Sequence, residues 1–257
     1  MKLWHETHGK GNDLVLLHGW GMNSAVWEPV IDQLDQHFTV TCIDLPGHGF
    51  STLADTDESK LENWADAIAA VVPENAIWLG WSLGGLLALQ AALNRTINIR
   101  ALLMVTASPS FMQRDNWQCA MSQQTLMQFS ENLKTDVKST LKRFLSLQIQ
   151  GCDNARDLLK KLRSGFAERP PATFHALEKG LVFLRDADLR ESLQTIAIPV
   201  HWLYGSQDTL IPACAADEIA FMMPSATSKI IHGAAHVPFL SHFEQVMPKL
   251  LELEQQV

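Results

Sequence analysis

The chain has 257 residues, 47% of them hydrophobic, and a formal net charge of −8 at pH 7. This length and composition suit one large α/β domain or a domain with an insertion, and the negative charge argues against a general nucleic-acid-binding protein. The sequence has no apolar run long enough to cross a membrane, and its first 13 residues lack the apolar run of a signal peptide. We therefore expect a soluble, cytoplasmic protein with no membrane or nucleic-acid partner. A monomer is a separate expectation, which no feature of the sequence tests.

The four cysteines, at positions 42, 119, 152 and 214, lie far apart and form no C-x-x-C pair. This spacing predicts neither a zinc knuckle nor a disulfide framework, so we expect buried or incidental thiols. No metal ion and no cofactor is expected.

Strands and helices alternate over the first 105 residues. Residues 2–7 resemble an edge strand, whereas the apolar runs 14–17, 39–43, 76–79 and 101–105 are typical of strands buried on both faces. Helical patterns cover 24–34, 61–72 and 86–93. This alternation predicts a mostly parallel sheet with helices on both faces, in which chemistry gathers at the carboxyl ends of the strands.

The pattern changes after residue 109. Residues 110–190 contain no convincing strand but several amphipathic helical stretches, including 123–133, 136–148 and 154–166. Strand patterns resume at 199–204 and 229–231, and a last helix covers 239–254. We interpret residues 1–109 and 191–257 as a core domain of α/β class and residues 110–190 as an inserted helical cap.

Charge is unevenly distributed between these parts. Residues 112–190 hold 13 Lys/Arg and 9 Asp/Glu, whereas the rest of the chain holds 7 and 19. Such an asymmetry is typical either of a docking face for an acidic partner or of a solvated helical surface.

The glycine-rich turn at residues 80–85 carries the first candidate for catalysis, Ser82. It joins an apolar strand to a run of strong helix formers. Glycines at 80 and 84 permit the close packing that a strained strand-turn-helix needs, and the turn places the serine hydroxyl at the end of the sheet beside the first helix amides. A chance match is the alternative for so short a motif.

A serine hydroxyl needs a base, and the base needs an orienting group. Asp208 follows the predicted strand 199–204, and His236 lies in the loop after strand 229–231. The chain order Ser82, Asp208, His236 is that of the α/β-hydrolase arrangement.

Four other residues are rival candidates for these roles. His232 is closer to its strand and is expected to be packed, whereas His236 is expected to be better exposed. The other three are Asp44, expected to shape its loop, His201, expected to be a satisfied core histidine, and His242, expected on the surface.

Two backbone amides complete an expected oxyanion hole, those of Leu83 and of Trp20 in the loop 18–21. Glycines on both sides of Trp20 let that loop approach the site. The indole of Trp20 is then expected to form a wall of the acyl pocket.

Six segments carry a resemblance to known proteins: LVLLHGWGMN (14–23), DLPGHGFS (44–51), AIWLGWSLGGLLA (76–88), RFLSLQ (143–148), LYGSQDTLIP (203–212) and AAHVPFLSH (234–242). Over essentially its whole length the chain resembles an α/β hydrolase. Within that superfamily it resembles the pimeloyl-[acyl-carrier protein] methyl ester esterases of biotin synthesis, and IWLGWSLGG and RFLSLQ are the discriminating segments.

The resemblance implies a serine esterase that hydrolyses a methyl ester on an acyl chain carried by acyl carrier protein. It implies that Ser82 attacks the ester carbonyl, that His236 transfers the proton and that Asp208 orients His236. With Trp20, five residues would line the acyl channel: Phe144, Leu145, Ser146, Leu147 and Gln148. Because the carrier is acidic, we hypothesise that it docks on four basic residues of the cap: Arg143, Arg156, Lys160 and Lys161.

Other functions remain open at this point. A broad-specificity short-chain carboxylesterase, a thioesterase or a carbon–carbon bond hydrolase shares most of these motifs. A non-catalytic binding protein on the same fold is a different class, which the intact Ser82, Asp208 and His236 disfavour.

Overall fold

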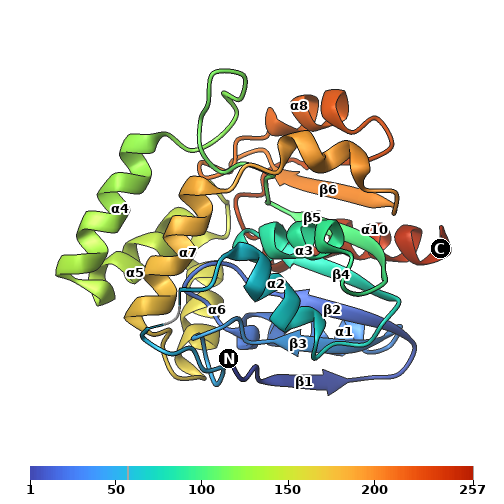
Figure 1. The fold of residues 1–257 in the computed structure, drawn as a ribbon, viewed down its shortest axis with the longest axis horizontal. Helices are drawn as coiled ribbons and strands as arrows, with labels where there is room; N and C mark the ends of the chain where they lie inside the picture. The colour runs from blue at the N-terminus through green and yellow to red at the C-terminus, as the bar shows by residue number, and fades with distance from the viewer. Residues whose placement is uncertain (57, 257) are drawn as a thin grey trace.

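A twisted seven-stranded sheet forms the centre of the computed structural model, which describes residues 1–56 and 58–256 (Figure 1). The strand order is β1-β3-β2-β4-β5-β6-β7. Only β1 runs antiparallel to its neighbour; the other pairs are parallel. The strands are β1 His5–His8, β2 Asn12–Leu17, β3 Phe38–Ile43, β4 Ala76–Trp81, β5 Ile99–Val105, β6 Val200–Gly205 and β7 Thr227–Ile231.

Helices cover both faces of this sheet and the ends of its strands. They are α1 Glu28–Leu34, α2 Leu61–Ala69, α3 Leu83–Asn94, α4 Gln123–Thr135, α5 Val137–Leu147, α6 Ala155–Ala167, α7 Phe174–Asp186, α8 Ala215–Met222, α9 Pro238–Ser241 and α10 Phe243–Gln255. The described residues also form two short 3-10 helices, η1 Ser24–Trp27 and η2 Arg190–Thr195.

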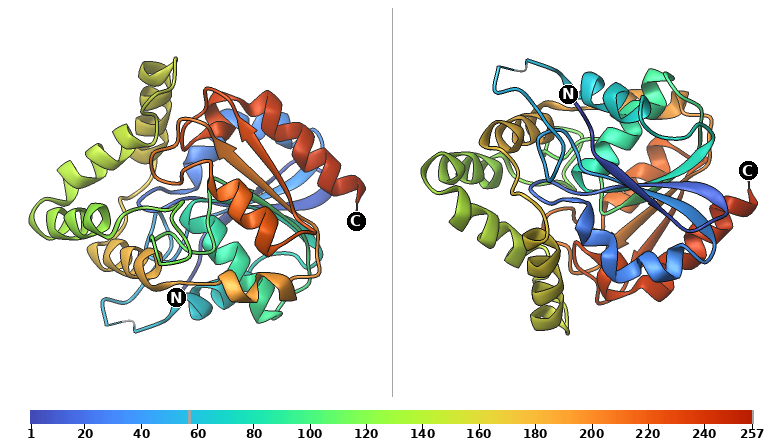
Figure 2. Two further views of the ribbon diagram at one scale, coloured as in Figure 1. Left: turned by 90° about the horizontal axis from the view of Figure 1, so that it is seen from above. Right: turned by 90° about the horizontal axis from the view of Figure 1, so that it is seen from below.

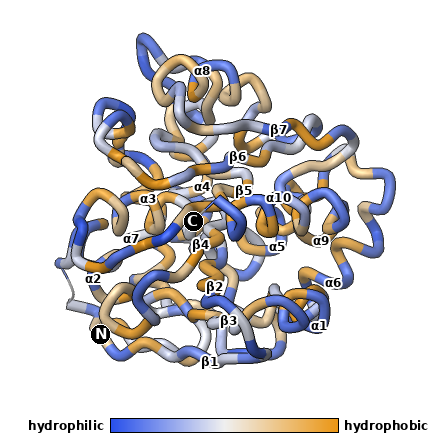
Figure 3. The backbone as a smooth tube through the Cα atoms, turned by 90° about the vertical axis from the view of Figure 1, so that its right-hand side faces the viewer, coloured by the Kyte–Doolittle hydropathy of each residue, from blue (hydrophilic) through white to orange (hydrophobic). Residues whose placement is uncertain are grey.

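Alternating strand residues pack into two hydrophobic cores, one on each face of the sheet. In β4, Trp78 points into the core that α2, α3 and α8 cover, whereas Ile77 and Leu79 point into the core that α1 and α10 cover. Both faces are therefore apolar, which explains the continuous hydrophobic strands. In Figure 3 the hydrophobic stretches gather around β2 and β4, and the hydrophilic ones lie mostly at the periphery.

Helices α4 to α7 lie beyond the carboxyl ends of the parallel strands (Figure 1). The views from above and below show the same group of helices to one side of the sheet (Figure 2). All four come between β5 and β6 in the chain, and residues 123–186, from α4 to α7, are called the helical segment. Any side chain that leaves the sheet at its carboxyl edge therefore meets these helices.

The predicted fold class is confirmed: the sheet is mostly parallel, with helices on both faces. The expected helices at 123–133, 136–148 and 154–166 correspond to α4, α5 and α6, and the expected edge strand corresponds to β1. Helices α7 and α8 were not predicted. The division into core and cap stays a prediction.

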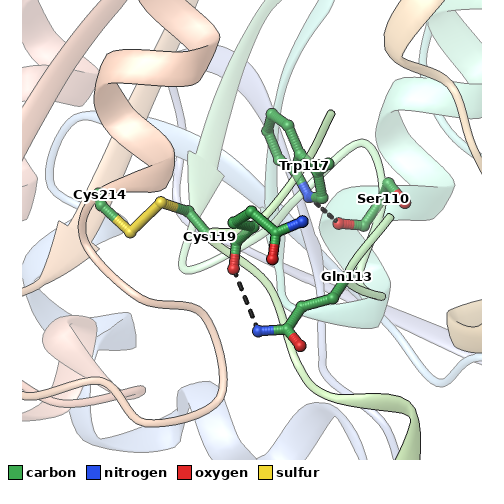
Figure 4. Close-up of a disulfide and its surroundings, with 6 residues drawn as sticks. Ser110, Gln113, Trp117, Cys119 and Cys214 are labelled. Carbon is green, nitrogen blue, oxygen red and sulfur yellow. Dashed lines mark hydrogen bonds between the residues drawn. A yellow bond between two sulfur atoms is a disulfide. The ribbon is translucent and has the colours of Figure 1, made fainter. Parts of the chain in front are cut away.

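The expectation about the cysteines is wrong for two of the four. Cys119 and Cys214 form a disulfide whose Cα atoms lie 5.6 Å apart (Figure 4). The residues are 95 positions apart in the sequence, and they meet because the loop after β5 lies beside the start of α8. Spacing along the chain does not show this proximity. Cys42 and Cys152 are free and buried, as expected.

No helix within residues 1–56 and 58–256 combines the length and the apolar character that a membrane span needs.

Candidate active site

Ser82 lies on the sharp turn between β4 and α3, in a strained backbone conformation with φ 55° and ψ −119°. The flanking glycines make room for this turn. A Cβ atom on Gly80 would collide with the backbone of Gly85, and one on Gly84 would collide with the carbonyl of Leu17. The sequence pattern therefore produces the expected strand-turn-helix, with the serine at the carboxyl edge of the sheet.

The structure also joins the two predicted partners, Asp208 and His236. The ring atom Nδ1 of His236 lies 2.7 Å from Oδ2 of Asp208, and both side chains are buried. The other carboxylate oxygen, Oδ1, accepts hydrogen bonds from the amides of Leu210 and Ile211, at 2.8 and 3.1 Å. With Nδ1–H donating to Asp208, the ring nitrogen Nε2 is left with a free lone pair for a proton.

Three remote residues hold the backbone of His236. The indole of Trp81, the neighbour of Ser82, and the hydroxyl of Thr106 donate to its carbonyl oxygen, at 2.8 and 2.9 Å. The amide of His236 donates to the carbonyl of Gln148 at the end of α5, at 3.0 Å. The sequence analysis assigned no role to Trp81 or Thr106. Trp81 ends β4 and Thr106 directly follows β5, at the edge of the sheet where catalysis was expected.

The histidine environments differ from the expectations. His232 is exposed and His236 is only 1% exposed, the reverse of what was predicted. His236 is enclosed because α5 and Trp81 cover it. His201 is buried as expected, but its Nδ1 has no hydrogen-bond partner in the described part of the chain, so it is not a satisfied core histidine. His242 is half-buried.

The loop with Trp20 lies against the serine turn. A Cβ atom on Gly19 would lie 3.3 Å from the Cβ of Ser82. Leu83 begins α3, so its amide is one of the first-turn amides that have no acceptor within the helix. The loop that carries Trp20 and the first turn of α3 therefore both lie against Ser82; the oxyanion hole stays a prediction.

Trp20 begins a row of aromatic rings that runs into the helices. Its indole is buried, donates to the carbonyl of Leu177 at 2.8 Å and meets the ring of Phe144 edge-on, with centroids 4.9 Å apart. Phe144 in turn contacts Phe129 of α4, at 5.8 Å. These rings give the region beside Ser82 an apolar wall.

The segment 144–148 divides between several environments. Phe144 and Gln148 are buried on the side of Trp20 and His236, and Leu147 is half-buried. Leu145 is buried in the core on the other face of the sheet. Ser146 is exposed and donates to the carbonyl of Lys142, so the structure does not bring its side chain to the site. Both polar atoms of the Gln148 amide are buried without a hydrogen-bond partner in the described residues.

The basic residues suggested for docking are all exposed on α5 and α6. Arg143 lies on α5, and Arg156, Lys160 and Lys161 lie on α6. Lys160 and Lys161 also line a groove of about 640 Å³ between α6 and α9. Asp157 lines the same groove, so the structure shows exposed cations on α5 and α6 with one carboxylate among them.

The catalytic candidates are almost completely buried. Ser82 is 4% exposed and Asp208 is 7% exposed. Trp20, Leu83 and Phe144 are buried with them. Within the described residues, no group of three or more His, Cys, Asp or Glu side chains is placed to hold a metal ion. A serine on a strained turn and a histidine oriented by a carboxylate are groups that can perform acyl transfer.

The sequence pattern of the alpha/beta hydrolase fold family matches residues 13–243. A solved esterase from Exiguobacterium antarcticum superposes with a TM-score of 0.88 at 25% identity, covering 97% of this chain and 94% of that one. A bromoperoxidase from Bacillus anthracis superposes equally well at 18% identity and shows the fold alone. The class is that of the α/β hydrolases.

More similar relatives define the family within that class. Proteins named pimeloyl-[acyl-carrier protein] methyl ester esterase are 39% identical in Aliivibrio salmonicida, over 96% of this chain and 94% of the relative, and 42% identical in Aeromonas hydrophila, over 93% and 94%. One from Pectobacterium atrosepticum is 38% identical over 98% of both chains. The chain therefore belongs to the pimeloyl-[acyl-carrier protein] methyl ester esterase family of α/β hydrolases.

Proposed function

We propose that this protein is a serine carboxylesterase that hydrolyses the methyl ester of pimeloyl-[acyl-carrier protein], releasing methanol, in biotin biosynthesis. The observation that carries the chemistry is the Asp208–His236 pair, in which the carbonyl of His236 accepts a hydrogen bond from Trp81, the residue before the strained Ser82. The substrate follows from the names of the relatives, which cover the chain almost completely.

The reaction proceeds in two acyl-transfer steps. His236 Nε2 accepts the proton of Ser82 Oγ as the hydroxyl oxygen attacks the ester carbonyl. The carbonyl oxygen becomes an oxyanion, which the amides of Trp20 and Leu83 stabilise. His236 then gives its proton to the departing methoxide, so that methanol leaves and the acyl group remains on Ser82. Water, activated by His236, attacks this acyl-enzyme, and the free carboxylic acid leaves.

Asp208 supports both steps by fixing the histidine. Its carboxylate keeps the proton of the neutral ring on Nδ1 and stabilises the imidazolium that forms. The amides of Leu210 and Ile211 hold the other carboxylate oxygen in place.

The acyl chain is proposed to lie along Trp20 and Phe144, with the segment 144–148 beside it. Apolar rings suit the methylene groups of such a chain. The Gln148 amide has buried, unpaired polar atoms next to the backbone of His236, and a polar atom of the ester or a water molecule would satisfy them. We therefore assign Gln148 to substrate contact, whereas Ser146 and Leu145 support α5.

Residues 1–109 and 191–257 are proposed to form the catalytic core, with 110–190 as a helical cap that receives the carrier. Arg143, Arg156, Lys160 and Lys161 supply a positive surface for an acidic carrier protein. A monomer in the cytoplasm remains our prediction, which light scattering and cell fractionation test.

One comparison of substrates tests the proposal. Wild type and Ser82→Ala are assayed with pimeloyl-carrier methyl ester and with p-nitrophenyl butyrate. We expect wild type to hydrolyse both with a higher kcat/KM for the carrier ester, and Ser82→Ala to hydrolyse neither. Turnover of the small ester alone would make the protein a general carboxylesterase, and activity in Ser82→Ala would refute the mechanism.

A further inference from the structure

Arg169 is a buried arginine of the helical segment. It begins a chain of contacts that ends at the loop 18–21, which carries Trp20. Arg169 comes between α6 and α7, and its side chain is 6% exposed. One guanidinium nitrogen lies 2.6 Å from Oε1 of Glu6, and another lies 3.3 Å from Oδ2 of Asp44. The group also stacks over the ring of Trp4, 3.8 Å from its centroid. A planar guanidinium serves all these partners at once, which an ammonium group does not.

The Asp44 carboxylate connects Arg169 to two loops by hydrogen bonds. It is fully buried, and such a group needs donors on both oxygens. Oδ1 accepts from the amide and the hydroxyl of Ser24, at 2.8 and 2.7 Å, and Oδ2 accepts from the amide of Phe50, at 2.9 Å. Ser24 follows the loop that carries Trp20, so Asp44 holds the far end of that loop.

The residue after Asp44 holds the near end of the same loop. The amide of Leu45 donates to Nε2 of His18, at 3.0 Å. A ring nitrogen that accepts must carry no proton, so the proton of the neutral ring is on Nδ1. Burial, together with the neighbouring His48, lowers the pKa of His18 to about 3, which keeps the ring neutral. His18 Nδ1–H can then donate to the carbonyl of Gly19, 2.8 Å away.

The carbonyl of Gly19 and the amide of Trp20 belong to the same peptide unit. That unit is planar and trans, so its C=O and N–H point in opposite directions. The Gly19 carbonyl accepts from His18 at 2.8 Å and from the amide of Met22 at 3.3 Å, and the shorter bond to His18 helps to fix the direction in which the Trp20 amide points. In the proposed mechanism, this amide donates a hydrogen bond to the oxyanion.

We propose that Arg169 is a positioning residue for the oxyanion hole, and that it acts through Asp44, Leu45 and His18 on the peptide between Gly19 and Trp20. The helical segment thereby contributes to stabilising the transition state as well as to binding the acyl chain. This inference rests on the proposed ester hydrolysis.

The test compares Arg169→Gln with the matched control Arg163→Gln, which removes an exposed arginine of α6. Both are assayed with p-nitrophenyl butyrate, which needs no carrier docking. We expect kcat of Arg169→Gln to fall roughly 10- to 100-fold with KM within about twofold, because a misdirected oxyanion donor weakens the transition state and leaves substrate binding intact. Arg163→Gln should keep both constants.

A second readout separates positioning from loss of structure. A boronic acid adds to Ser82 and mimics the tetrahedral intermediate, so its inhibition constant should rise by the same factor as kcat falls. In Arg169→Ala, added guanidinium ion should restore part of the lost kcat by occupying the vacated site. Arg169→Lys should be intermediate, because it keeps the charge but loses the planar fork.

Two results would overturn the inference. The first is an Arg169→Gln variant with wild-type kcat and unchanged boronate affinity. The second is additive loss in the double variant His18→Gln/Arg169→Gln, since residues on one chain of contacts should be non-additive. If Arg169→Gln does not fold, Arg169→Lys and His18→Gln carry the same comparison. A wild type that hydrolyses neither ester would refute the proposed function, whereas an active wild type with an unimpaired Arg169→Gln refutes this inference alone.

Discussion

Gly180 of α7 packs directly against the indole of Trp20: a Cβ atom on Gly180 would lie 2.6 Å from Cδ1 of that ring and 3.1 Å from Nε1. The same atom would lie 3.3 Å from a methyl group of Leu83. One glycine of the helical segment thus touches both residues whose amides are assigned to the oxyanion hole.

Replacing Gly180 with alanine is therefore expected to reduce turnover. The added methyl group must displace Trp20, which is buried and hydrogen-bonded to Leu177. We expect kcat/KM for p-nitrophenyl butyrate to fall roughly tenfold or more, since small misplacements of a catalytic group are costly. Glu178→Ala, on the same helix, is the control and should retain activity. A fully active Gly180→Ala would contradict this packing argument.

The indole N–H of Trp81 should matter for catalysis more than that of Trp78. Trp81→Phe removes the donor to the His236 carbonyl, whereas Trp78 Nε1 has no hydrogen-bond partner in the described residues. Each substitution keeps an aromatic ring in a core position. We expect Trp81→Phe to lose about 1 kcal/mol of stability relative to Trp78→Phe, and several-fold in kcat. Urea unfolding measures the stability and steady-state kinetics measures kcat. Equal stability and equal kcat in the two variants would contradict the role given to Trp81.

Acid should destabilise the folded protein through two buried histidines. Burial lowers the pKa of His18 to about 3 and that of His48 to about 4. Between these values and about 6.5, the unfolded chain binds protons that the folded protein does not. The full contribution is therefore present above about pH 6.5 and is lost as the pH falls toward the folded pKa values, by roughly 1.4 kcal/mol per pH unit for each histidine.

Urea unfolding at pH 7 and pH 5 measures this dependence. His48→Gln should flatten the pH dependence, and His232→Gln, at an exposed position, should leave it unchanged. A His48→Gln variant with the wild-type slope would rule out the assignment to His48.

The disulfide between Cys119 and Cys214 should stabilise the protein. It closes a loop of 95 residues, for which the chain-entropy estimate is roughly 4 to 5 kcal/mol. Cys214 is exposed, so a small thiol has access to the bond. We expect dithiothreitol to lower Tm of the wild type and to have no effect on Cys119→Ser/Cys214→Ser. Titration of four thiols in the unfolded protein without reductant would show that the bond does not form.

Charge reversal on the helical segment tests carrier docking. With Arg143, Arg156, Lys160 and Lys161 all changed to glutamate, KM for the carrier ester should rise about tenfold or more, since each exposed pair contributes roughly 0.2 to 1 kcal/mol. High salt should weaken binding of the wild type in the same way. Kinetics with p-nitrophenyl butyrate should be unaffected, and Lys10→Glu is the control for a charge change elsewhere. Equal losses on both esters would exclude a docking role.

The sequence predicted the parallel sheet and the three catalytic candidates for the same physical reason. Buried strands produce continuous apolar runs, and parallel strands bring the loops after them to one edge. Ser82 and Asp208 each follow such a run, whereas His236 follows the mostly exposed edge strand β7, and the parallel pairing of β7 with β6 brings its loop to the same edge of the sheet. The burial of His236 could not be predicted from the sequence. It depends on contacts with α5 and Trp81, which lie far from His236 in the chain.

The role of Arg169 was hidden for a related reason. In the sequence, Arg169 is one of the basic residues of 112–190, for which a solvated surface was an open alternative. In the structure it is buried against Asp44 and Glu6. The disulfide was hidden likewise, since no local pattern reports that residues 119 and 214 meet. Local sequence predicts elements and strand ends, but long-range pairing decides which polar groups are enclosed.

The enclosure of Ser82 and His236 has a kinetic consequence. Because these residues expose only a few per cent of their surface, admission of the ester, and later of the water that releases the acyl group, becomes part of each catalytic cycle. Such admission can limit turnover independently of how well the serine is activated. With the proposed substrate, slow admission of water would also prolong the lifetime of the acyl-enzyme.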